Sequence, residues 1–167
     1  MFNPRLRAEA FEPYPKMIEY MKDIIRLNDI PNMRVNEFGL SDRERKCDMQ
    51  FASPFQRSEL NLNVGTTNIR TDAEGDFIFK SLDSLNVEMM DLVKIDVEGH
   101  EMELLEGARE TFKRCRPAYI QIEIHNTHRD RKERVRTILE KYLDNDYIVS
   151  LNFLKFHGDY FFMRKDF

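Results

Sequence analysis

The sequence predicts an α/β fold built around a mixed β-sheet, and three observations lead to this expectation. Strand-like and helix-like segments alternate along the chain, which is the pattern of a sheet whose strands are joined by crossover helices. Residues 91–96 (DLVKID) form the clearest strand, and a helix follows almost at once. Two strand-like segments near the end flank a turn at residues 157–159, which is typical of an antiparallel hairpin.

The first half of the chain predicts a strand, a helix and further strands. Residues 6–11 alternate apolar and polar side chains, as a half-buried strand does. Pro15 stands where a first helical turn begins, and apolar residues at three- and four-residue spacing then predict an amphipathic helix that ends at residues 28–31. Further strands are expected at residues 33–38, 46–51 and 77–82. The polar stretch 53–76 predicts either a long loop or a hairpin insertion.

The second half predicts two more helices and the closing hairpin. A helix is expected from about residue 101, and residues 118–124 form the next strand. Residues 129–144 predict a long charged helix with a narrow apolar stripe. The hairpin strands are residues 147–153 and 159–164. Because no internal repeat or linker is visible, we predict one domain over residues 1–167.

Composition and charge exclude several classes of protein. Hydrophobic residues make up 41% and charged residues 34%, as in a soluble globular protein. The net charge of −4 argues against a general binder of nucleic acid or anionic membranes, and the basic residues between 129 and 136 are interrupted by Asp130 and Glu133, as on a solvated helix face. No apolar run approaches the ~20 residues that span a bilayer. Cys47 and Cys115 lack zinc-site spacing, so a reducing, cytoplasmic setting is expected.

In two short segments, polar residues directly follow the end of a predicted strand. Glu12 follows the first strand, where nucleotide-binding α/β folds place an acid that accepts hydrogen bonds from ribose hydroxyls; alternatively, it is an exposed residue before a proline stop. Leu40, Ser41 and Asp42 follow a later strand, where a short loop lies beside the ribose site and can meet an adenine. The alternative for this loop is an ordinary turn or helix cap.

A third segment, residues 94–101 (KIDVEGHE), places acids and a glycine between a strand and a helix. Open α/β sheets bind their ligands at the carboxyl ends of parallel strands. Crowded carboxylates there repel one another unless a cation, a positive ligand or a shared proton relieves them. Alternatively, Glu98 and Glu101 only complement the dipole at the start of the helix.

Together with other segments, these residues resemble the FkbM methyltransferase family. The shared order is FEPYP at residues 11–15, LSD at 40–42, SLDSL at 81–85, KIDVEGHE at 94–101, EGA at 106–108, QIEIH at 121–125 and DYFF at 159–162. The resemblance covers nearly the whole chain, and FEP in combination with IDVEGHE is its most specific part. It implies a Rossmann-like methyltransferase fold and methyl transfer from S-adenosylmethionine to a hydroxyl of a small molecule, sugar or lipid.

The resemblance also implies roles for individual residues. Glu12 and Pro13 would hold the ribose, Leu40, Ser41 and Asp42 would edge the adenine, and Asp96 would lie near the methionine end. Glu98, His100, Glu123 and His125 would surround the acceptor. The base that removes the acceptor proton is expected among Asp96, His100, Glu123 and His125, alone or through a divalent metal. For each histidine, a surface or capping role is the alternative.

The chain departs from the family's pattern before Glu12. Family members have a first strand, a glycine-rich loop and a helix there, whereas about ten residues precede Glu12 in this chain. The six glycines include no close pair; they are Gly39, Gly65, Gly75, Gly99, Gly107 and Gly158. We therefore expect a truncated domain without the first strand and glycine loop, in which cofactor binding is weak or lost.

In that fold the missing strand lies in the centre of the sheet. Its absence would leave a gap of about 10 Å, two strand spacings, with unpaired backbone groups that cost about 1–3 kcal/mol each. Three alternatives stay open: the half-sheets pair directly, another chain donates a strand, or the chain is a fragment of a longer protein.

Two functions compete with methyl transfer. The first is a non-catalytic remnant that acts as an interaction or dimerisation module through its exposed strand edges. The second is a metal-dependent enzyme of another class that uses Asp96, Glu98, Glu123 and His125. The sequence identifies no methyl acceptor.

Overall fold

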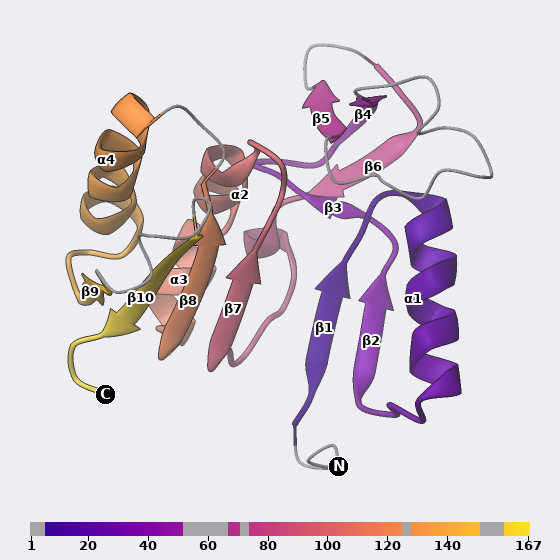
Figure 1. Cartoon of the computed structure of the whole chain (residues 1–167), viewed down its shortest axis with the longest axis horizontal. Helices are drawn as coiled ribbons and strands as arrows, with labels where there is room; N and C mark the ends of the chain where they lie inside the picture. The colour runs from indigo at the N-terminus through magenta and orange to yellow at the C-terminus, as the bar shows by residue number, and fades with distance from the viewer. Residues whose placement is uncertain (1–5, 52–66, 71–73, 125–127, 151–158) are drawn as a thin grey trace.

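A computed structural model describes residues 6–51, 67–70, 74–124, 128–150 and 159–167 (Figure 1). The chain begins with a β–α–β unit of β1 (Ala8–Phe11), α1 (Pro15–Leu27) and β2 (Met33–Asn36). The two strands pair in parallel, as expected for strands joined by a crossover helix. Proline occupies the first turn of α1, where its missing N–H costs no hydrogen bond.

The second half forms a four-stranded sheet in the order β7–β8–β10–β9. Its strands are β7 (Leu92–Ile95), β8 (Tyr119–Glu123), β9 (Tyr147–Val149) and β10 (Asp159–Arg164). β7 and β8 are parallel, whereas β10 is antiparallel to both β8 and β9. The mixed α/β architecture and the antiparallel pairing at the C-terminal end are therefore confirmed; the turn predicted at residues 157–159 lies partly outside the described residues.

A smaller four-stranded sheet has the order β3–β6–β4–β5. Its strands are β3 (Gly39–Leu40), β4 (Arg45–Phe51), β5 (Thr67–Arg70) and β6 (Phe77–Lys80). β5 falls within the polar stretch whose structure the sequence left open, and it pairs with β4 in antiparallel fashion. A hairpin therefore fits this stretch better than a plain loop, although residues 52–66 and 71–73 lie outside the described part.

The helices of the second half differ from the sequence prediction. The helix expected from residue 101 is two helices, α2 (Glu101–Gly107) and α3 (Arg109–Cys115), with Ala108 in a non-helical conformation between them. At the end of α2, a Cβ on Gly107 would overlap the carbonyl oxygen of Ser41, so glycine permits a close backbone approach there. The long charged helix is α4 (His128–Thr137), which continues into a π-helical turn, η3 (Ile138–Tyr142). A 3₁₀ turn, η2 (Leu82–Ser84), precedes β7.

The main hydrophobic core lies between the larger sheet and the helices α2, α3 and η3. Every second residue of the central strands points into it, as shown by Ile120 and Ile122 of β8 and Phe162 of β10. Leu105, Phe112 and Ile138 cover these residues from the helices. The two cysteines are free, and Cys47 belongs to a small separate cluster with Met49 and Phe79.

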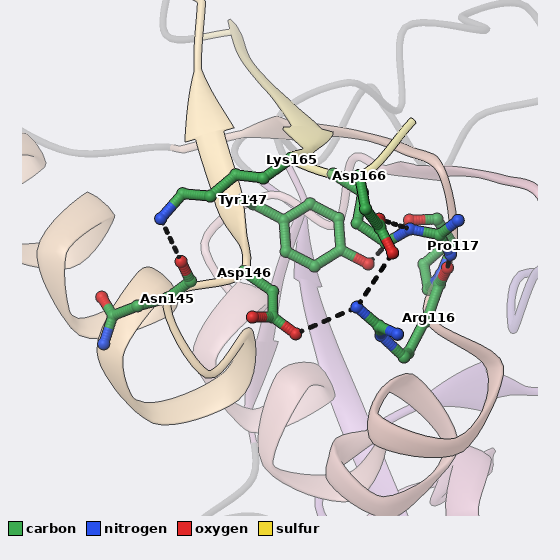
Figure 2. Close-up of polar contacts among 8 residues, drawn as sticks. Arg116, Pro117, Asn145, Asp146, Tyr147, Lys165 and Asp166 are labelled. Carbon is green, nitrogen blue, oxygen red and sulfur yellow. Dashed lines mark hydrogen bonds and ion pairs between the residues drawn. The ribbon is translucent and has the colours of Figure 1, made fainter.

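Polar contacts fasten the last residues of the chain to the end of α3 (Figure 2). The guanidinium of Arg116 lies 3.2 Å from Asp146 and 3.4 Å from Asp166. The buried Tyr147 hydroxyl donates to the carbonyl of Pro117 at 2.6 Å, and Lys165 donates to the carbonyl of Asn145 at 2.6 Å. These contacts hold β9 and β10 on the sheet.

The edges of β1 and β7 are the two strand edges that would border the gap predicted from the sequence. β1 pairs with β2 and β7 pairs with β8, and the described residues form no ladder between β1 and β7. Figure 1 shows that all four strands point in the same direction. Direct pairing of the two half-sheets, one of the three alternatives, is therefore not observed. No helix in the described ranges is both long and apolar enough to cross a membrane.

Candidate functional site

Glu12 lies directly beyond the carboxyl end of β1, and its side chain is half-buried. Its Oε1 accepts a hydrogen bond from the backbone N–H of Tyr14 at 2.7 Å. Burial raises the pKa of the carboxyl group, and the Tyr14 hydrogen bond opposes this effect. Within the described residues Oε2 receives no hydrogen bond, so one oxygen stays available to a hydroxyl donor.

The loop after β3 meets the start of α2 through two buried side chains. The Ser41 hydroxyl lies 3.0 Å from His100 Nε2, although 59 positions separate the two residues. Ser41 also donates to Oδ1 of Asp42 at 2.9 Å, so its oxygen accepts the Nε2–H of His100. Two segments of the resemblance, residues 40–42 and 94–101, therefore lie in direct contact.

Charged groups surround this contact. Arg45 pairs with Oδ1 of Asp42, the same oxygen that accepts from Ser41. His100 Nδ1 lies 3.7 Å from a carboxylate oxygen of Glu103. Burial lowers the pKa of His100, Glu103 opposes this shift and Arg45 adds to it. Burial thus favours the neutral imidazole, and the Ser41 contact favours the tautomer that carries its proton on Nε2.

The turn between β7 and α2 has an unusual backbone. Glu98 has a φ of 52° and Gly99 a φ of 96°, so two successive residues occupy the left-handed region. The Gly99 N–H donates to Oε1 of Glu101 at 2.7 Å. Glu101 is completely buried, and its Oε2 lies 3.2 Å from the Arg134 guanidinium of α4.

A third group of side chains lies at the carboxyl ends of β7 and β8. Because Ile95 pairs with Ile122, Asp96 and Glu123 are the next residues on neighbouring parallel strands. Lys94 donates to Asp96 at 3.0 Å. This hydrogen bond raises the pKa of Lys94, and the carboxylates of Asp159 and Glu123 act in the same direction. The predicted acids Asp96 and Glu123 are thus brought together beside a cation.

Other sequence-predicted residues are placed less decisively. Pro13 and Leu40 are half-buried next to Glu12 and Ser41, respectively, and His125 lies outside the described residues. A hollow of about 270 Å³ is lined by residues that include Arg7 and Arg34. Another, of about 450 Å³, is lined by residues that include Asp83 and Arg114. Neither is lined by a predicted site residue.

Sequence reasoning missed several residues of the site. Asp159 and Arg134 act on residues that are distant in the sequence, so no local pattern indicates them. Arg45, by contrast, lies three residues after its partner Asp42, and that spacing is a local signal. The sequence leaves Glu101 either among the acids of a ligand site or at the helix dipole, and its complete burial is not predicted because a charged side chain is rarely fully buried. Among the described residues, no three His, Cys, Asp or Glu side chains lie close enough to hold a metal ion.

Comparison with protein families identifies a methyltransferase FkbM domain over residues 5–149. The chain belongs to this family. The match includes the segments that contain Glu12, residues 40–42 and residues 94–101.

Among solved structures, the FkbM methyltransferase from Methylobacillus flagellatus KT has a similar fold, with a TM-score of 0.63 at 17% sequence identity. The similarity covers 93% of this chain but 36% of the Methylobacillus protein, so the chain spans about a third of that relative's length. The comparison with curated proteins gives no match.

Proposed function

We propose that this chain binds S-adenosylmethionine and takes part in transferring its methyl group to a hydroxyl of a small molecule, sugar or lipid. The observation that carries the proposal is the half-buried Glu12 carboxylate at the end of β1. Its Oε2 is open to a ribose hydroxyl, while Oε1 is fixed by Tyr14. A carboxylate held in this way presents one fixed acceptor oxygen to a ribose hydroxyl.

The loop after β3 offers a carboxylate oxygen in the same manner, in this case to an adenine. Ser41 and Arg45 both contact Oδ1 of Asp42, and Oδ2 receives no hydrogen bond from the described residues. A carboxylate oxygen is a suitable acceptor for the amino group of adenine. The contact with His100 holds this loop in place. The adenosine half of the cofactor therefore has candidate partners on two loops.

The bound cofactor supplies an electrophilic methyl group, so the protein mainly aligns and deprotonates the acceptor. We assign proton removal to Asp96 or Glu123, which follow adjacent parallel strands. His100 is less suited, because its Nε2 proton is engaged with the buried Ser41. The chain has no close glycine pair, so no glycine loop of its own would hold the methionine end, and weak binding is expected.

Isothermal titration calorimetry with S-adenosylhomocysteine tests the proposal. Glu12→Gln keeps the shape but removes the charge, and hydrogen bonds to charged groups contribute about 1.5–3 kcal/mol. We therefore expect binding to weaken about 10- to 100-fold. Glu9→Gln is the matched control, because Glu9 lies on the same strand and contacts Asn36; its effect is expected to stay below about twofold. Wild-type protein that binds nothing at millimolar ligand, or equal binding by Glu12→Gln, contradicts the proposal.

A second candidate function is an interaction module that accepts a strand from another copy of the chain. It is favoured by the edges of β1 and β7, which lack a ladder partner on one side within the described chain, because exposed edges are templates for strand addition. Light scattering after size exclusion distinguishes the two functions. A strict monomer at high protein concentration counts against strand donation.

A further inference from the structure

Glu101 is the most deeply buried carboxylate among the described residues, with no exposed surface. Burial of a lone charge is costly, and such a group normally requires a partner. Its partners include the Gly99 N–H at 2.7 Å and the Arg134 guanidinium at 3.2 Å. The side chain therefore connects the turn after β7 to α4.

The turn that Glu101 holds is the least favourable stretch of backbone near the site. A left-handed conformation is unfavourable for a residue other than glycine, and Glu98 adopts it with a φ of 52°. Gly99 follows with a φ of 96°, which only glycine adopts readily. A charge-assisted hydrogen bond to the Gly99 N–H is strong enough to offset this cost.

We infer that Glu101 and Arg134 are positioning residues that fix the turn carrying Asp96 and Glu98. The inference rests on the proposed function, because it assigns the purpose of the turn to that site. Asp96 lies two residues before Glu98, at the end of β7, so a change in the turn reorients its backbone directly. Arg134 neutralises Glu101 from α4, the helix that follows the strand bearing Glu123. The turn thereby sets the position of Asp96, whose neighbour at the end of the paired strand β8 is Glu123.

Amide exchange at Gly99 tests the inference without any assay of activity. Selective ¹⁵N-glycine labelling leaves six amide signals, because the chain contains six glycines. In Glu101→Gln, a neutral acceptor replaces the carboxylate and Arg134 loses its partner charge. We expect the Gly99 amide to exchange at least about tenfold faster, whereas Gly39 and Gly107 change less than about twofold.

Two further variants separate positioning from general stability. Arg134→Met removes the same ion pair from the side of the partly exposed arginine, so it is expected to speed exchange of the Gly99 amide as Glu101→Gln does. Arg134→Lys keeps the charge, so it is expected to retain most of the protection of the Gly99 amide. Glu106→Gln is the matched control on the same helix, because Glu106 forms an exposed pair with Lys141 at 2.7 Å. It is expected to leave Gly99 unchanged.

Each outcome decides the matter. Unchanged Gly99 exchange in both Glu101→Gln and Arg134→Met overturns the inference, as does a uniform rise at all six glycines, which indicates a structural role only. If Glu101→Gln does not fold, Arg134→Met provides the decision. Titration of the same variants with S-adenosylhomocysteine is a separate measurement: we expect about fivefold weaker binding. If wild-type protein binds no ligand, the proposed function fails while the Gly99 measurement still reports on the turn.

Discussion

The β1–α1–β2 unit and the larger C-terminal sheet each contain a parallel strand pair, β1–β2 and β7–β8, but the two regions are packed very differently. In the C-terminal sheet, Ile120, Ile122 and Phe162 are almost completely buried under helices. In the first unit, Ile18 is the one residue of α1 that is buried, and Leu27 is 72% exposed. No side chain of α1 belongs to either hydrophobic cluster in the described part of the chain.

Because of this difference, the region that provides most of the stability is not the region that carries the proposed ribose-binding residue. Parallel strands are normally covered on both faces, and apolar burial is the dominant favourable contribution to folding. The C-terminal sheet therefore provides most of the stability. The first unit, with its sparse packing, carries Glu12, the residue on which cofactor binding depends in our proposal.

The largest expected effect is that of a cavity in the C-terminal core. Phe162 of β10 is 1% exposed, and truncation of such a residue to alanine typically lowers the free energy of unfolding by about 3–5 kcal/mol. We expect Phe162→Ala to do so in urea denaturation. Leu27→Ala, in the exposed part of α1, is expected to cost less than about 0.5 kcal/mol. Equal losses from the two variants would contradict the comparison.

A smaller effect is expected from the hydrogen bond that joins Tyr147 of β9 to the carbonyl of Pro117. Tyr147→Phe removes the donor to the Pro117 carbonyl and leaves a buried acceptor unpaired, which costs about 1–3 kcal/mol. Burial also raises the pKa of Tyr147 to about 12, against about 10 in an unfolded chain.

Because of that pKa shift, the difference in the free energy of unfolding between wild type and Tyr147→Phe should depend on pH. Between pH 10 and 12 the unfolded chain has lost the phenol proton while the folded chain retains it, so stability falls as pH rises. The stability advantage of the wild type should therefore be fully present below pH 10 and shrink towards pH 12. Urea denaturation of both proteins at pH 8 and pH 11 checks this, and a constant difference would show that the hydroxyl is not buried as described.

The two regions also differ in what the sequence could reveal. The strand and helix of the first unit follow from local patterns, namely alternation before Glu12 and the apolar spacing after Pro15. The contact of Ser41 with His100 does not, because it depends on the packing of α2 against the loop after β3. The break at Ala108 has one local signal, the preceding Gly107, because glycine is a poor helix former. Both motifs were predicted to be functional, but only tertiary structure shows that they touch.

The stability of Glu12→Gln tests whether Glu12, in the first unit, contributes to folding. Because burial raises the pKa of this carboxyl, the folded state disfavours the charged form, and stability declines as pH rises past the unfolded pKa. A neutral Gln avoids that cost and can still accept from the Tyr14 N–H. We expect Glu12→Gln to unfold at pH 7 at the same or a slightly higher urea concentration than wild type. A clear loss of stability would show that Glu12 is structural.

The smallest effect is expected at His100, where α2 meets the loop after β3. Since burial lowers the pKa of this imidazole, the unfolded chain takes up a proton below about pH 6.5 while the folded chain does not. Stability should thus be fully present above pH 6.5 and decline as the pH falls. His100→Gln retains a donor for Ser41 and should weaken this decline between pH 7.5 and 5.5 in urea denaturation. Glu103→Gln removes the carboxylate that opposes the shift, so it should steepen the decline. If neither variant alters the slope, folding does not lower the pKa of His100, and its burial beside Ser41 does not keep the imidazole neutral.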